Sequence, residues 1–187
     1  PKVFMGENVK GLISHENGRT FETIKNTIAE LGYTLVEPRV LRAIMYQVPQ
    51  KRERLILIAI RNDIAQNVEF HWPTPYHEVL TLRDALYKSV IYENDVPVSE
   101  GAQYPEKKKR VLAMVPQGGD WRNLPEEVAK DYMGGSWLLG GGKTGMARRL
   151  SLDEPSLTLT CSPCQKQTER CHPLETRPLS IREYARI

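Results

Sequence analysis

The sequence has no long hydrophobic run. Its longest uninterrupted apolar stretch, residues 55–60, is far shorter than the about 20 residues that cross a bilayer as a helix, so the sequence predicts no membrane span. It also lacks a positively charged start followed by an apolar stretch and a small-residue cleavage site, which predicts no secretory signal. We find no internal repeat and no low-complexity tract beyond a glycine cluster at residues 134–145.

Cysteine is scarce, and the three that occur, Cys161, Cys164 and Cys171, share one short stretch. An odd number of cysteines without a secretory signal indicates reduced thiols and a cytosolic compartment. Cys161 and Cys164 have part of the spacing of a zinc site, but Cys171 and His172 are adjacent and no second Cys-x-x-Cys follows. We therefore expect a protein without a metal site that is cytoplasmic, or nuclear if its source is a eukaryote.

Charge of neither sign dominates. The 187 residues include 26 Lys and Arg and 23 Asp and Glu, and the resulting net charge of +3 by itself indicates no nucleic-acid partner. Hydrophobic residues make up 40% and charged residues 26% of the chain, which is typical of a folded globular protein rather than a disordered one. This length predicts one domain, or one domain with a small appendage.

The first 86 residues have the pattern of an α/β domain. Apolar side chains recur at helical spacing within residues 21–31, and Gly32 follows as a helix stop. Residues 54–61 are rich in β-branched side chains and are bounded by charge, as expected of a strand buried on both faces. Helical segments that alternate with apolar strands predict an α/β sheet.

The rest of the chain has a different character. Residues 87–177 are rich in proline, glycine and charge and contain short strand-like pieces such as residues 111–115, so we predict a small, loop-rich, mainly β domain. A last helix is expected to begin within residues 178–187, because Ser180 can cap its first turn while Glu183 reaches back, as in a capping box.

Four short motifs follow one another in a fixed order. Glu-Asn-Val occupies residues 7–9 directly after an apolar strand, and Gln-Lys-Arg-Glu-Arg occupies residues 50–54 at the start of the buried strand. Thr-Leu stands at residues 158–159, and Arg-Glu-Tyr-Ala-Arg at residues 182–186. Each motif alone is common by chance, but their order, with a long variable stretch between the second and the third, is specific.

This set resembles the C-terminal half of DNA (cytosine-5) methyltransferases of the bacterial restriction–modification type. In that family the first two motifs belong to the catalytic domain, Thr-Leu lies late in a variable target-recognition region, and Arg-Glu-x-Ala-Arg follows. The resemblance implies the C-terminal part of a Rossmann-like S-adenosylmethionine-dependent methyltransferase domain at residues 1–86. It further implies a target-recognition, DNA-binding domain at residues 87–177 and, at residues 178–187, the start of a helix that returns to the catalytic domain.

The resemblance also implies a cofactor and partners. The substrate would be a short site in double-stranded DNA, and the methyl donor would be S-adenosylmethionine. The family's glycine-rich cofactor loop and its Pro-Cys nucleophile precede Glu-Asn-Val, where this sequence has only six residues, so we expect no cofactor-binding residue here and a fragment that is inactive alone. Its partner would be the missing N-terminal half or a second copy, joined through an exposed sheet edge.

By resemblance, Glu7 and Arg54 would hold an extruded cytosine. A cysteine thiolate adds to C6 of the flipped base, which puts negative charge on N3 and O2 of the ring. Glu7, buried in its acid form, would donate to N3 and Arg54 to O2, so that both interactions strengthen in the transition state. Arg52 would contact the pocket or a phosphate, and Asn8 would fix the loop. The alternative is a surface carboxylate beside a solvated strand edge on which the arginines pair with Glu53.

Residues 143–149, residues 158–172 and the last helix are expected to face DNA. Reading the major groove needs side chains with paired donors and acceptors, whereas phosphate contacts need cations and a close backbone approach, which glycine permits. The alternative is a flexible, solvated loop, and this is our expectation for the basic run at residues 107–110. The candidate DNA contacts are Lys143, Thr144, Arg148, Arg149, Thr158, Thr160, Gln165, Lys166, Gln167, Arg170 and Arg182.

Two other interpretations stay open. Ser-Pro-Cys-Gln at residues 162–165 resembles the family's nucleophile loop, but it lies where target-recognition residues belong, so we do not expect Cys164 to be the nucleophile. The chain can also be a non-catalytic, sequence-specific DNA-binding module that uses the same basic surface without chemistry at Glu7.

Overall fold

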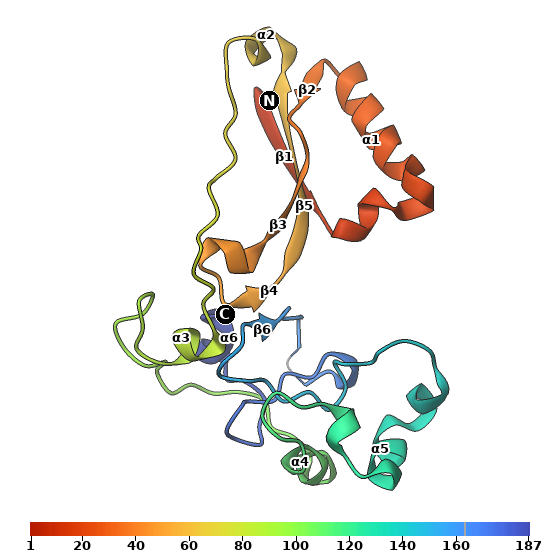
Figure 1. The fold of residues 1–187 in the computed structure, drawn as a ribbon, viewed down its shortest axis with the longest axis vertical. Coiled ribbons are helices and arrows are strands. Elements are labelled where there is room, and N and C mark those ends of the chain that lie inside the picture. Colours follow the sequence, from red (N-terminus) through yellow and green to blue (C-terminus); the bar gives the residue numbers. More distant parts are fainter. Residues whose placement is uncertain (163) are drawn as a thin grey trace. The chain divides into compact units, whose positions relative to one another are not determined.

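A computed structural model of the chain describes residues 1–162 and 164–187, which form two compact units (Figure 1). Unit 1 comprises Pro1–Tyr46 and Arg52–His77, and unit 2 comprises Gln47–Lys51 and Glu78–Ile187. The division therefore falls close to, but before, the domain boundary expected after residue 86. The functions assigned to residues 1–86, 87–177 and 178–187 stay predictions.

Unit 1 is a four-stranded sheet built around β5 (Glu53–Arg61). Along one edge β5 pairs with β1 (Val3–Asn8), and along the other with β2 (Tyr33–Leu35) and β3 (Arg39–Arg42), in each case antiparallel. The central strand carries an almost continuous run of buried apolar side chains, with Leu55 only 1% exposed. The buried strand predicted at residues 54–61 is thus confirmed, because apolar side chains on both of its faces are buried.

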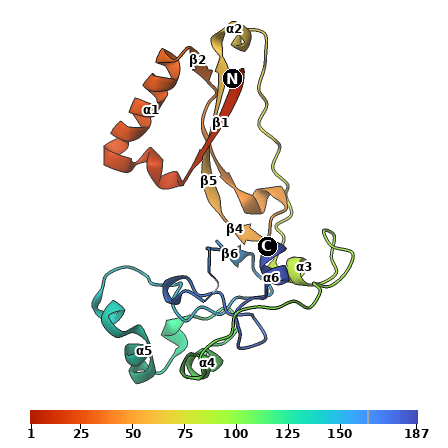
Figure 2. The ribbon, with the colours of Figure 1, turned by 180° about the vertical axis from the view of Figure 1, so that it is seen from behind.

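One long helix accompanies this sheet. Figures 1 and 2 show α1 (Arg19–Glu30) beside the strands, as the helical spacing predicted. Gly18 precedes it and Gly32 follows it, both with positive φ (+88° and +82°), a backbone conformation that glycine adopts without strain. The short α2 (Asn62–Ala65) follows β5. The 3₁₀ turns of this unit are Lys10–Ile13, His15–Gly18 and Ala43–Tyr46.

Unit 2 has little regular structure, and its expected mainly β character is not found. Its described residues contain one parallel pair of two-residue strands, β4 (Gln50–Lys51) and β6 (Ser156–Leu157). The strand predicted at residues 111–115 is wrong, because most of that segment is the last turn of a helix. The helices are α3 (Leu82–Leu86), α4 (Glu106–Ala113), α5 (Glu126–Met133) and α6 (Ile181–Ala185). The 3₁₀ turns are Trp121–Asn123, Gly134–Leu138 and Lys166–Thr168.

Two apolar clusters form the core of unit 2. In one, Leu112 of α4 and Ala129 of α5 pack with other buried side chains, and in the other Leu86 of α3 packs with Leu150 and Leu179. Chain segments that are far apart in sequence thereby become neighbours. The apolar burial in this unit therefore comes from short helices and loops rather than from sheet faces.

The predicted capping box of the last helix is confirmed. The Ser180 side chain accepts from the Glu183 N–H, and the Glu183 carboxylate accepts from the Ser180 N–H at 2.7 Å. These reciprocal bonds satisfy two amides that the first turn of a helix would otherwise leave unpaired. By its contacts α6 lies in unit 2.

None of the helices in the described part of the chain combines the length and the apolar character that crossing a membrane requires.

Candidate catalytic pair and DNA-facing surface

Glu7 and Arg54 lie side by side on neighbouring strands of unit 1. Glu7 of β1 is opposite Ile56 of β5, and Arg54 stands two residues before Ile56, so both side chains project from the same face of the sheet. The Arg54 Nε lies 2.6 Å from the Glu7 Oε1. Antiparallel register therefore brings together two residues that are distant in sequence.

Arg52 joins the same carboxylate from a greater distance. Its guanidinium lies 3.6 Å from the Glu7 Oε1, and it stands two residues before Arg54, on the same side of the chain. Arg54 also donates to the carbonyl of Glu53 at 2.8 Å, which ties its guanidinium to its own strand. The alternative interpretation, in which these arginines pair with the Glu53 carboxylate, is not what the structure shows.

Glu53 instead pairs with cations from two other segments. Its carboxylate binds Lys10, which follows the Glu-Asn-Val motif, and lies 3.1 Å from the Nε of Arg42 on β3. The hydrogen bond from Lys10 is the main reason that the pKa of Glu53 lies below its ordinary value, against a smaller opposing effect of burial. These ion pairs link the segments that flank the candidate site.

Two expectations about this site are corrected or sharpened by the structure. We expected Glu7 to be buried, but its side chain is 45% exposed in this chain. Asn8 points away from the pair, since adjacent strand residues face opposite sides, and its Oδ1 accepts from the Val9 N–H at 2.8 Å. This bond lies where the chain leaves β1, and the loop-fixing role of Asn8 stays a prediction.

Among the candidate DNA contacts, Arg149 and Arg170 are structural in this chain. Each is only 5% exposed. Arg149 donates to the carbonyls of Val115 and Leu112, at 2.7 Å each, and also binds residues of the 172–176 turn. Arg170 donates to the carbonyl of Thr158. Because these guanidinium groups are already satisfied inside the protein, we do not retain them as DNA contacts.

The other candidates are spread over the surface and the loops of unit 2. Thr144 is exposed at the end of the glycine cluster, while Lys143 donates to the carbonyl of Trp137 at 3.1 Å. Arg148 lies 3.7 Å from the Asp120 carboxylate, and its buried Nε has no partner among the described residues. Gln165, Lys166, Gln167 and Arg182 are exposed, whereas Thr158 and Thr160 are half-buried and hydrogen-bonded within the protein.

The cysteines do not gather into a site. Cys161 is exposed and Cys171 is buried, where burial raises its thiol pKa to about 11. Burial likewise raises the pKa of Cys164. In the described part of the chain no group of three or more His, Cys, Asp or Glu is placed to hold a metal ion. The proline of the Ser-Pro-Cys-Gln segment lies outside the described residues.

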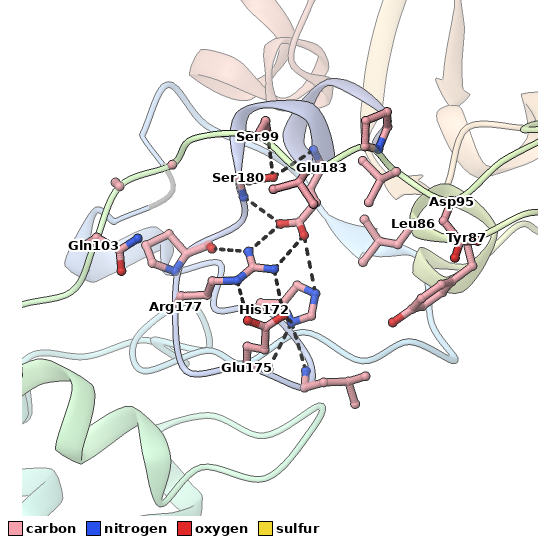
Figure 3. Close-up of a pocket in the computed structure, with 17 residues that line it drawn as sticks. Leu86, Tyr87, Asp95, Ser99, Gln103, His172, Glu175, Arg177, Ser180 and Glu183 are labelled. Atoms are coloured by element: carbon pink, nitrogen blue, oxygen red, sulfur yellow. Dashed lines mark hydrogen bonds and ion pairs between the residues drawn. The ribbon is translucent and has the colours of Figure 1, made fainter.

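A charged cluster around the buried side chains of His172 and Glu183 in unit 2 was not predicted from the sequence. It lines a cavity of about 440 Å³, where Arg177 binds both Glu183 and Glu175 (Figure 3). Burial favours the neutral acid of Glu183, but the hydrogen bonds from Arg177 and from the Ser180 N–H outweigh it and lower its pKa. The one sequence signal for this cluster is the capping box itself, which places Glu183.

His172 completes the cluster and is held neutral. Its Nδ1 accepts from the backbone N–H groups of Leu174 and Glu175, at 3.2 and 3.1 Å. Burial, reinforced by the positive charge of Arg177, lowers the His172 pKa. With every N–H of Arg177 already donating to Glu175, Glu183 or the Pro178 carbonyl, the cluster has no free cation for a ligand. It is a structural element of the fold.

Comparison with known proteins places the chain among DNA-modifying enzymes. It is 66% identical to the Type II methyltransferase M.Eco47II of Escherichia coli over 187 residues, 100% of this chain and 45% of that protein. It is 57% identical to M.PspPI of Psychrobacter sp. (strain TA137), again over 100% of the chain and 45% of the relative, and 51% identical to M.Sau96I of Staphylococcus aureus, over 100% and 42%. The chain thus spans less than half the length of these relatives.

The fold and a family model agree with this. A solved structure described as a DNA modification methyltransferase encoded within a prophage of E. coli matches the whole chain and 58% of its own, with a TM-score of 0.57 and 18% identity, which supports the mixed α/β, Rossmann-like fold. The model of C-5 cytosine-specific DNA methylases matches residues 1–187. The chain belongs to the family of C-5 cytosine-specific DNA methylases.

Proposed function

We propose that this chain supplies the base-binding acid, its arginine partner and the target-recognition region of a DNA (cytosine-5) methyltransferase. The observation that carries this proposal is the contact of Arg54 with Glu7 on adjacent strands. The complete enzyme would transfer a methyl group from S-adenosylmethionine to C5 of a cytosine flipped out of a specific duplex site.

The pair suits the charge that develops during this reaction. When a thiolate adds to C6, electron density moves onto N3 and O2 of the ring. Glu7 in its acid form donates its proton toward N3, and Arg54 donates an N–H to O2. Both interactions grow stronger as the negative charge forms, which lowers the barrier rather than only tightening substrate binding.

The contacts of Arg54 support this division of labour. Its Nε faces Glu7 and one of its terminal amino groups donates to the Glu53 carbonyl, which leaves the other terminal amino group for the substrate. A guanidinium fixed at two of its three nitrogens loses little freedom when a base binds, so its remaining donors are preorganised.

S-adenosylmethionine, which supplies the methyl group, is not held by this site. Arg54 of the candidate pair and the nearby Arg52 place two guanidinium groups at this site, and a sulfonium cation does not fit beside them. We therefore derive no step through the cofactor and propose that its contacts come from a further part of the protein. The same part would provide the nucleophile, so the chain alone is expected to be inactive.

The edge of unit 1 supports a partner of this kind. In the described residues β1 pairs with β5 alone, and its Val3 and Met5 are 48% and 68% exposed. An unpaired strand edge with apolar side chains favours association with another chain or segment. We propose the N-terminal half of the enzyme as the occupant, with a second copy of this chain as the alternative.

The proposal is tested by restoring the missing part. The chain is fused to the region of M.Eco47II that it does not span, and methyl transfer from labelled S-adenosylmethionine to duplex DNA is measured. Glu7→Ala should lower the rate by about 10²–10⁴ while duplex binding survives. Glu30→Ala, an exposed acid at the end of α1, is the matched control and should leave both unchanged.

The outcomes separate the enzyme from the binding module. Unchanged turnover in Glu7→Ala would contradict the role of the acid. A fusion that binds a specific duplex but transfers no methyl group, with or without Glu7, would favour the non-catalytic DNA-binding module.

A further inference from the structure

We propose that a cavity in unit 2 lined by α4, α5 and Lys166 binds a phosphate group of the DNA backbone. The cavity has a volume of about 310 Å³, and its polar lining consists of Lys107, Lys108, Asp131, Tyr132 and Lys166. This inference rests on the proposed function, because it names an anchoring point for the same DNA. It also revises our expectation that the basic run at residues 107–110 is only a solvated loop, since that run forms part of α4.

The back of this cavity is rigid. Glu169 is fully buried, and its carboxylate lies 2.6 Å from the Lys108 Nζ and accepts hydrogen bonds from the hydroxyls of Tyr104 and Tyr132, at 2.8 and 3.3 Å. Lys108 also donates to the Cys164 carbonyl at 2.7 Å. A buried carboxylate with this many partners fixes the side chains around it, so Lys108 and Tyr132 form a preorganised wall.

Two other lysines of the cavity are held only by weak contacts and can bind an anion. Lys166 holds its ammonium group 5.1 Å from the centre of the Tyr132 ring, and its single hydrogen bond, to the Met133 carbonyl, is long at 3.5 Å. No carboxylate in the described part of the chain lies within ion-pair distance of it. Lys107 pairs with Asp131 at 3.1 Å, but both side chains are largely exposed, and such surface pairs contribute little.

A phosphate suits this arrangement in charge, size and place. Lys107 and Lys166 each supply a positive charge for a DNA phosphate, which carries a single negative charge. The charge of Lys108 is already balanced by Glu169. Lys166 stands between Gln165 and Gln167, two exposed candidates for base contact. Since phosphate contacts set the register in which nearby side chains reach the bases, an anchor at Lys166 would position these glutamines.

The first test measures how the affinity of the 187-residue chain for a random-sequence duplex depends on salt. Loss of one phosphate contact should reduce the slope of log K against log salt by about 0.9. We expect this reduction for Lys107→Ala and for Lys166→Ala. Lys109→Ala removes the same charge from the same helix without lining the cavity and should change the slope much less. Equal changes in all three variants would overturn the proposal in favour of a general electrostatic effect.

A variant that is expected to bind DNA more tightly controls for the possibility that the lysine variants bind weakly because they misfold. Asp131→Asn removes the carboxylate that competes for Lys107, so it should tighten duplex binding and increase the salt slope. A damaged fold cannot produce tighter binding. Unchanged or weaker binding by this variant would count against the cavity.

Inorganic phosphate distinguishes the sources of the ligand. At constant ionic strength, replacing chloride by phosphate should raise the melting temperature of the wild type, and Lys166→Ala should lose this increase. If phosphate stabilises the protein but the lysine variants bind duplex normally, the cavity takes free phosphate and the DNA anchor is refuted. If phosphate has no effect, the site itself is refuted while DNA binding by the chain can stand. If the wild type binds no duplex at all, the proposed function fails together with the anchor.

Discussion

The two units of this chain use charged side chains in opposite ways. In unit 1 the sheet and a buried apolar strand supply the stability, and the charged residues Glu7, Arg52 and Arg54 remain partly exposed at its surface. In unit 2, where regular structure is sparse, charged groups are buried and bind backbone carbonyls, as Arg149 and Arg170 do. Arginine is thus available for chemistry in one unit and is part of the framework in the other.

The largest effect on stability is expected from breaking the framework of unit 2. Arg177→Met leaves the Glu183 carboxylate, which is 7% exposed, without its arginine partner, and an uncompensated buried charge costs about 4 kcal/mol of unfolding free energy. Urea unfolding measures this loss. Arg182→Met changes an exposed arginine five positions away on α6 and should lie within about 0.5 kcal/mol of the wild type. A loss no larger than that of this control would show that the buried pair does not hold unit 2 together.

Unit 1 should instead depend on apolar packing. Leu55→Ala empties a position in β5 that is 1% exposed, and it should lower the unfolding free energy by about 3 kcal/mol. Val40→Ala, on the neighbouring β3 and 37% exposed, is the control and should cost less than about 1 kcal/mol. If Leu55→Ala lowers the unfolding free energy no more than Val40→Ala does, the sheet tolerates a cavity at its centre.

Acid should weaken unit 2 through His172. Burial first, and the charge of Arg177 second, hold the pKa of His172 below its ordinary value of 6.5. The unfolded chain therefore binds a proton more readily than the folded one, and the stability that neutral His172 contributes is lost as the pH falls from about 6.5 through the lowered pKa. Unfolding curves at pH 7.5 and about pH 5.5 should show the loss, and His172→Gln should reduce it. If this variant keeps the full pH dependence, other groups cause it.

The smallest effect on stability is expected at Glu7 and Arg54, the proposed catalytic pair. Glu7→Gln removes the charge of a half-exposed carboxylate, and surface ion pairs contribute at most about 1 kcal/mol, so thermal unfolding should hardly change. In the fused enzyme the same variant should lose most of its methyl transfer. A large loss of stability would instead assign Glu7 to the framework and remove the contrast between the two units.

The sequence predicted unit 1 better than unit 2, for a physical reason. Helical spacing before Gly32 and the apolar run ending in Ile60 are local patterns, and they predicted α1 and β5 correctly. The contact of Glu7 with Arg54 followed from the order of motifs together with the family resemblance. The strand at residues 111–115 was wrong, because a short apolar run fits a buried helix as well as a strand.

The sequence could not predict which arginines of unit 2 are buried and which are accessible. Arg148 and Arg149 are adjacent and both follow the glycine cluster, yet only the second is almost fully buried and surrounded by carbonyl groups. What decides between them is the path of the chain near residues 112, 115 and 172, which are distant in sequence. The cluster of Glu169 with Lys108 escaped prediction for the same reason, since its members are joined only by tertiary structure.

The alternation of side chains along β1 and β5 limits how this enzyme family can change. Glu7 meets Arg54 because each occupies the correct parity in its strand, and shifting either strand by one position would turn its functional group to the far side of the sheet. Inserting or deleting a single residue inside either strand would therefore separate the acid from the guanidinium, whereas a change of two residues would keep both on the same face. The loops of unit 2 are not bound by strand parity, so a change in their length would leave the acid and the guanidinium in register.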